Sequence, residues 1–220
     1  MNNEISNHSV RQLIRSCTKG YLSTQFDKEK SKKMFLNFWN VAEDDPRNYR
    51  DGLYFKKVQH IEDVEIEIIA LDTRYFRSKL NGKNNAYKPN KNPQATILGK
   101  MQWDWFESSI INSTAKAIII VSSIQVLATD HPYEKWANFP LERSKLIRIL
   151  SEAAQDKAII IVSGDRHRSG IYQNDYFTEI TASSLNKPGS RFKESDPLLL
   201  GETFPEINYG VLNIQPAEKQ

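Results

Sequence analysis

The chain has 220 residues, 39% of them hydrophobic, which is enough to bury the core of one domain. Its 30 basic and 27 acidic residues leave a formal net charge of +3, an excess too small to indicate nucleic acid by itself. The single cysteine, Cys17, excludes a disulfide framework and a thiolate metal cluster, and the apolar runs are too short for a membrane span.

The first 26 residues are polar and lack the apolar segment of a signal peptide, so we expect no signal peptide and assign them no role. Location in the cell stays open. A helix is expected at residues 27–40, with Met34, Phe35 and Phe38 on its apolar side. Four lysines of this helix are predicted to form a solvated face: Lys28, Lys30, Lys32 and Lys33.

Two strands are expected at residues 52–55 and 64–71. In the second strand, apolar residues at 64, 66 and 68 alternate with acidic residues at 63, 65 and 67, which predicts one wet face. The strand leads into Asp72, Arg74 and Arg77. Arginine forks suit phosphate oxygens, but Asp72 could equally pair with either arginine and only fix a loop.

Residues 81–94 are rich in Asn, Lys and Pro, which predicts a mobile surface loop. A helix is expected at 100–113, and Trp103, Phe106 and Ile110 are spaced to lie on one side of it, as core residues.

The segments KAIIIVSS at 116–123 and KAIIIVSG at 157–164 predict two buried strands, separated by a helix at 140–155. Strand, helix and strand over this length indicate a βαβ unit with parallel strands. Gln125 therefore leaves the sheet at the same edge as Asp165 and His167, where open α/β sheets bind ligands.

Asp165, Arg166, His167 and Arg168 follow the second buried strand directly. They indicate a ligand site, or else a local turn in which Asp165 caps the backbone and both arginines face water. The other histidine-carboxylate neighbours, Asp130 and His131, are disfavoured as metal ligands, because adjacent residues on an extended loop rarely face one ion.

The rest of the chain predicts a strand at 177–182, a loop at 187–206, a final strand at 208–214 and a polar tail at 216–220.

Seven motifs in one order resemble the catalytic domain of the PhoD-like alkaline phosphatases, a branch of the calcineurin-like metallophosphoesterases. The motifs are LDTRYFRS at 71–78, LGKMQWDWF at 98–106, SSIQ at 122–125, the run 136–143, SGDRH at 163–167, SSLN at 183–186 and NYG at 208–210. The resemblance implies a phosphatase domain over residues 27–215.

The implied fold is α/β, the C-terminal half of a four-layer α/β sandwich with a mixed sheet and metal ions at the strand ends. The implied reaction is hydrolysis of phosphomonoesters or diesters by a metal-activated hydroxide. The resemblance makes His167 a metal ligand, with Asp165 in or beside the metal's coordination. It places Arg74 and Arg77 near the phosphate, Gln125 on the edge of the site and Arg166 among the anion-binding residues.

The chain departs from the family in its first half. That family carries most metal ligands in an Asp-x-His, a Gly-Asp pair and an Asp/His-rich segment, and none of these precedes the matched region here. One carboxylate and one imidazole cannot complete a two-metal site.

Two hypotheses follow. The first is a metal-dependent phosphoester hydrolase whose remaining ligands come from a missing N-terminal half or a second chain. Calcium and iron are the metals implied by resemblance, with manganese or zinc as alternatives. The second is a non-catalytic remnant with weak anion binding at Arg74, Arg77 and Arg166. A nucleic-acid-binding module ranks far below both, because no recognised binding motif accompanies the charge.

Overall fold

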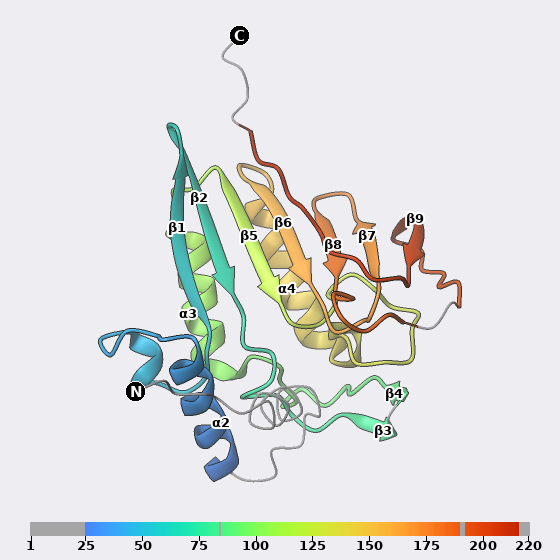
Figure 1. Cartoon of the computed structure of the whole chain (residues 1–220), viewed down its shortest axis with the longest axis horizontal. Coiled ribbons are helices and arrows are strands. Elements are labelled where there is room, and N and C mark those ends of the chain that lie inside the picture. Colours follow the sequence, from blue (N-terminus) through green and yellow to red (C-terminus); the bar gives the residue numbers. More distant parts are fainter. Residues whose placement is uncertain (1–24, 84, 190–191, 216–220) are drawn as a thin grey trace. The chain divides into compact units, whose positions relative to one another are not determined.

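The computed structural model describes residues 25–83, 85–189 and 192–215. It divides into two compact units, residues 1–54 and 55–220, which are described separately (Figure 1). The N-terminal segment and the polar tail discussed above, with Cys17, lie outside the described residues except for residues 25 and 26. No described helix has the length and apolar character needed to cross a membrane.

The first unit contains helix α2 (Gln25–Phe38) and the 3-10 turn η1 (Pro46–Asn48). The prediction of a fully solvated lysine face is wrong for Lys32, which is only 7% exposed. Its Nζ donates to the carbonyl oxygen of Arg50, so the stem is buried while the charged head keeps a partner. The apolar side also differs from the prediction, because Leu36 is buried and Phe38 is 37% exposed.

The second unit is built on a seven-stranded mixed sheet in the order β1-β2-β5-β6-β8-β7-β9. Its four central strands are parallel, and the strands at both edges pair antiparallel. In this order the strands are β1 (Phe55–Ile61), β2 (Val64–Ala70), β5 (Ala117–Ser122), β6 (Ala158–Ser163), β8 (Thr178–Ala182), β7 (Ser169–Gln173) and β9 (Leu199–Phe204). The predicted mixed α/β fold is confirmed.

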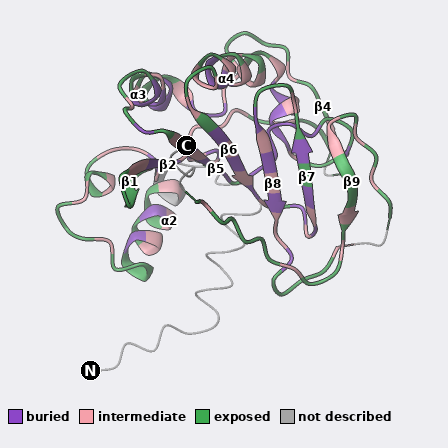
Figure 2. Ribbon diagram, turned by 90° about the horizontal axis from the view of Figure 1, so that it is seen from above, coloured by how far each residue is buried: buried purple, intermediate pink, exposed green. Residues whose placement is uncertain are grey.

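The parallel pair β5 and β6 is connected through helix α4 (Pro140–Ala153), as the βαβ prediction requires. Helix α3 (Gly99–Ile111) lies beside α4 on the same face of the sheet (Figure 2). The predicted apolar side of α3 is confirmed, since Trp103, Phe106 and Ile110 are each at most 6% exposed. These side chains and the sheet residues facing them form the main core.

The two faces of the sheet differ in burial. On the helix-covered face, Ile118, Ile120 and Ile161 are fully buried, whereas on the opposite face Val121 and Ile171 are 37% and 45% exposed. The last described segment crosses this second face, where Gly210 lies against Ala182 of β8. Because strand side chains alternate between faces, one face is sealed by helices and the other stays partly open.

Three strand predictions are wrong. The first strand occupies Phe55–Ile61 rather than 52–55, because it is an edge strand whose polar residues face water. Glu67 does not lie on a wet face: it is 2% exposed and forms an ion pair of 2.7 Å with Lys56 on β1. Residues 208–214 form no strand, apart from one bridge between Ser184 and Asn208.

The predicted loops contain further short strands. The segment 81–94 carries the hairpin of β3 (Asn81–Lys83) and β4 (Ala86–Lys88). The segment 187–206 carries β9, which pairs with the unpredicted strand β7. These short strands are held by pairing with neighbours, so their own residues give little periodic signal.

Candidate active site

The loop after β2 is fixed by its own aspartate and by a residue of α3. One carboxylate oxygen of Asp72 accepts the backbone N–H groups of Arg74 and Tyr75, each at 2.9 Å. Gln102, fully buried, accepts the N–H of Asp72 at 2.8 Å and donates to its carbonyl at 2.9 Å. This arrangement directs the Arg74 and Arg77 side chains from the carboxyl end of a parallel strand.

Three loops meet at this edge of the sheet, after β2, β5 and β6. The hydroxyls of Thr73 and Ser123 hydrogen-bond to each other and join the first two loops. Arg74 Nη2 donates to Asp165 Oδ2 at 2.8 Å and joins the first loop to the third. Arg74 and Asp165 therefore lie together although 91 positions separate them in the sequence.

Glu134 completes this arginine-carboxylate cluster, and the sequence analysis did not single it out. Its carboxylate pairs with Arg74 Nη1 and lies 3.0 Å from Arg77 Nε. The side chains of Glu134 and Arg77 are only 10% and 6% exposed. Arg74, Arg77 and Glu134 thus form a largely buried ion-pair network. Removal of one of these charges would leave its partners buried without compensation.

Burial and charge act on these groups in opposite directions. Burial raises the pKa of Asp165 above its usual value, while Arg74 opposes the shift. Burial lowers the pKa of Arg74, but Glu134 and Asp165 outweigh this and raise it overall. The Asp165 carboxylate therefore depends on Arg74 to remain ionised in a partly desolvated position.

The turn from Asp165 to Arg168 distributes its side chains between two places. Asp165 and His167 both have left-handed backbone, with φ of 62° and 54°. The carboxylate of Asp165 contacts Arg74. His167 is near enough to Asp165 to lower the pKa of that carboxylate electrostatically. Arg166 and Arg168 instead contact Glu194. Left-handed non-glycine residues are uncommon and cluster at functional sites.

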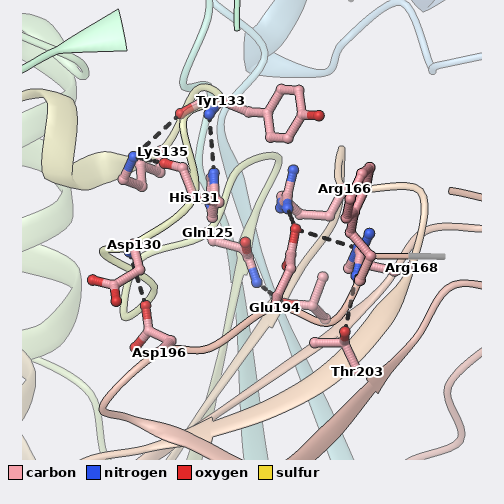
Figure 3. Close-up of polar contacts among 12 residues, drawn as sticks. Gln125, Asp130, His131, Tyr133, Lys135, Arg166, Arg168, Glu194, Asp196 and Thr203 are labelled. Atoms are coloured by element: carbon pink, nitrogen blue, oxygen red, sulfur yellow. Dashed lines mark hydrogen bonds and ion pairs between the residues drawn. The ribbon is translucent and has the colours of Figure 1, made fainter. Parts of the chain in front are cut away.

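Arg166 is thus not brought together with Arg74 and Arg77. Its guanidinium pairs with Glu194 and lies 4.7 Å from the ring centroid of Tyr133 (Figure 3). It is 6% exposed, so the turn does not leave this arginine in water. Its backbone N–H donates to Ser183 Oγ at 2.9 Å.

Gln125 lies below the open edge rather than on it. It is 1% exposed, and its Nε2 donates to Thr181 of β8 at 2.9 Å. Its Oε1 is buried without a hydrogen-bond partner among the residues that the structure describes. Gln125 therefore packs inside the sheet unit and does not reach the arginine-carboxylate cluster.

The described residues do not fit a complete metal pair. Within the described ranges, no group of three or more His, Cys, Asp or Glu side chains is placed to hold a metal ion. Asp165 is also engaged by Arg74. The two residues expected to be ligands, Asp165 and His167, come from one turn and supply too few donors for two ions.

Comparison with known proteins identifies the family of the chain. Residues 64–209, more than half of the chain, match the family model of the PhoD-like phosphatases. Alkaline phosphatase D of Bacillus subtilis (strain 168) is 25% identical over 112 residues, which is 46% of this chain and 19% of that protein.

Two solved structures share the fold. The structure of PhoD aligns with a TM-score of 0.56 and 20% identity, over 72% of this chain and 34% of that chain. GAP50, the anchor in the inner membrane complex of Plasmodium, aligns with a TM-score of 0.51 and 14% identity. The alignment covers 70% of this chain and 44% of that chain. The chain thus spans about a fifth of the curated relative and a third of PhoD. With its family-model match and its metallophosphoesterase-type fold, the chain belongs to the PhoD-like phosphatase family.

Proposed function

We propose that the chain carries part of the active site of a phosphoester hydrolase. In this proposal Arg74 and Arg77 bind the phosphate oxygens, and Asp165 and His167 are metal ligands. Support comes from the family match and from the position of these residues at the carboxyl ends of parallel strands. We extend the phosphatase domain over residues 27–215, beyond the segment matched by the family model.

The observation that carries the proposal is the contact between Arg74 and Asp165. An arginine after one parallel strand and a carboxylate after another lie 2.8 Å apart, in the order of motifs that the resemblance gave. Guanidinium groups hold phosphate oxygens in two parallel hydrogen bonds, and the Arg74 side chain is still 19% exposed. A phosphate that reaches Arg74 from solvent has to compete with Asp165 for it.

The family implies calcium and iron, and the donor count is the reason to propose that this chain needs help to hold them. Asp165 and His167 would bind one side of a metal, and the other ligands would come from a missing N-terminal half or a second chain. Bound metal would supply the hydroxide and the charge for attack on phosphorus. We derive no catalytic step through metal from the described residues, because they do not form that centre.

A second candidate function is a non-catalytic member of the fold. The low number of metal donors in the described residues favours it, and GAP50, with the same fold, is described as an anchor. In that case the arginine-carboxylate cluster would be structural, or would bind anions weakly.

The test is hydrolysis of a chromogenic phosphomonoester and a phosphodiester by the purified chain, with calcium, iron and manganese screened in turn. Any turnover is expected to be slow, to require a metal, and to be lost in both His167→Ala and Arg74→Gln. Arg148→Gln, on the exposed face of α4, is the control of equal charge change and should behave as wild type. Turnover that survives His167→Ala would contradict the assignment, and no turnover above the variant would mean that the chain does not act alone.

A further inference from the structure

A pocket is lined by residues other than those of the arginine-carboxylate cluster. It has a volume of about 400 Å³ and lies between the loop after β5, strand β7 and the segment 192–196. Its lining includes His131, Tyr133, Arg168, Tyr172 and Glu194. Figure 3 shows His131, Tyr133, Arg168 and Glu194 of this lining, together with Lys135 and Arg166. The proposed hydrolase site does not use this pocket.

Three cations are buried around the pocket. Lys135, Arg166 and Arg168 are 5%, 6% and 5% exposed. Both arginines share one carboxylate, that of Glu194, with Arg168 Nε at 3.4 Å. Buried charges in proteins are usually paired, and Glu194 is an ion-pair partner of both guanidinium groups.

The third cation, Lys135, is held by backbone carbonyl groups. Its Nζ donates to the backbone carbonyls of His131 and Tyr133 rather than to a carboxylate (Figure 3). Asp196 is near enough to act on it electrostatically. The carboxylate of Asp196 is already engaged, however, because it accepts the backbone N–H groups of Thr129, Asp130 and Leu198. Asp130, which also lines the pocket, acts on Lys135 in the same sense, so the carboxylates of Glu194, Asp196 and Asp130 equal the three buried cations in number.

His131 supplies a donor that faces no protein acceptor. Its Nδ1 accepts the N–H of Tyr133 at 3.2 Å. Burial, followed by the charges of Arg166, Lys135 and Arg168, lowers its pKa to about 2, so the ring is neutral and its proton is on Nε2. His131 is 8% exposed, and Nε2 is buried without a hydrogen-bond partner among the described residues. Such a donor is costly unless something accepts from it.

We propose that this pocket binds a small oxyanion, a phosphate or carboxylate group, which accepts from His131 Nε2–H and is held by Arg168. The pocket has the size for such a group, a guanidinium in its lining and a buried donor with no acceptor among the described residues. Arg168 already donates to Thr203 Oγ1 at 2.9 Å and to the carbonyl of Phe192, which fixes its guanidinium at the pocket wall.

Glu194 makes the proposal specific. It lines the pocket and occupies the arginines with its own carboxylate, so it competes with any incoming anion. Glu194→Gln removes that competing charge and should tighten oxyanion binding about tenfold, because the arginines then face an incoming anion without a carboxylate rival. A purely structural ion pair predicts no gain in binding.

The experiment is an NMR titration of the ¹⁵N-labelled chain with inorganic phosphate, read at the imidazole and backbone signals of His131. Sulfate and acetate titrations tell a tetrahedral ligand from a carboxylate. His131→Phe and Arg168→Gln are expected to weaken binding roughly tenfold or more. Arg148→Gln, which removes an equally charged arginine from an exposed ion pair, should bind as wild type.

Arg74→Gln distinguishes the two sites, because it should leave this binding intact while it weakens any phosphate contact at the hydrolase site. The proposal is overturned if phosphate leaves the His131 signals unchanged, or if only Arg74→Gln abolishes binding. It is also overturned if Glu194→Gln binds phosphate no more tightly than wild type. None of these readouts depends on metal or turnover, so the proposed hydrolase function can fail independently.

Discussion

The carboxylate of Glu134 pairs with both Arg74 and Arg77, and Asp165 pairs with Arg74 as well, so Glu134 joins the two arginines of the candidate site. We expect Glu134→Gln to lower the free energy of unfolding by about 3 kcal/mol, because removing one partner leaves buried charge without compensation. Urea denaturation followed by circular dichroism measures this change.

Glu202→Gln is the matched control for this substitution, since it removes a carboxylate from the exposed ion pair with Lys193. Its urea midpoint should stay near that of wild type. Equal effects of the two substitutions would show that the Glu134 network contributes nothing beyond surface charge.

His131 gives a prediction about pH. Its pKa is about 2 in the folded chain and 6.5 in its ordinary state, so below pH 6.5 the unfolded chain binds a proton that the folded chain does not. Stability contributed by neutral His131 is therefore complete above pH 6.5 and is lost as the pH falls below it. The free energy of unfolding should fall more steeply between pH 6.5 and 5 in wild type than in His131→Gln.

Two buried carboxyl groups act in the opposite sense in the same measurement. Burial raises the pKa of Glu179 and of Asp165, so their contributions are lost as the pH rises through their ordinary range. Both groups are present in wild type and in His131→Gln, and their effects cancel in the comparison. Parallel pH profiles for the two proteins would argue that His131 is not held neutral.

The sequence predicted part of this site at the level of single residues. Arg74 and Asp165 were selected because each follows a buried strand, and parallel pairing brings them together. The position of the Arg166 side chain could not be predicted in the same way. It depends on the left-handed backbone at Asp165 and His167, which sets the direction of the side chains in this turn. Glu134 was missed because a lone glutamate in an irregular loop has no periodic signal.

At the level of elements, helix α4 holds the start of α3 through one side chain. Glu142 accepts the backbone N–H groups of Ile97 and Leu98, the hydroxyl of Thr96 and the indole N–H of Trp103. This carboxylate thus joins two helices that both cover the same face of the sheet.

Glu142→Gln should therefore lower the free energy of unfolding by about 1–3 kcal/mol, because an amide replaces one acceptor oxygen with a donor that faces other donors. Glu152→Gln on the same helix, which breaks an exposed pair with Arg148, should change it by about 0.5 kcal/mol or less. Thermal unfolding of both variants measures these two changes in the free energy of unfolding. A loss for Glu152→Gln as large as that for Glu142→Gln would mean that the joint between α3 and α4 is unimportant.

Elements with strong internal periodicity were predicted, and elements held by their neighbours were not. The strands β5 and β6 and the helices α3 and α4 carry their apolar pattern within their own residues. The strands β7 and β9 depend on each other and on β8. Residues 208–214 are apolar enough to suggest a strand, but they cross the open face of the sheet instead of pairing along it.

At the scale of the whole molecule, the chain has the family's fold around a site with too few metal donors in its described residues. It spans about a fifth of alkaline phosphatase D and a third of PhoD. The central claim is therefore that Asp165 and His167 form one side of a metal site that other ligands must complete.

Titration of the ¹⁵N-labelled chain with Mn²⁺ tests this claim most directly, because the paramagnetic ion broadens the NMR signals of the residues that it touches. The account predicts weak binding, with broadening centred on residues 165–167, that His167→Ala removes and His131→Phe leaves unchanged. Two manganese ions held tightly by each chain, or broadening that persists in His167→Ala, would contradict it.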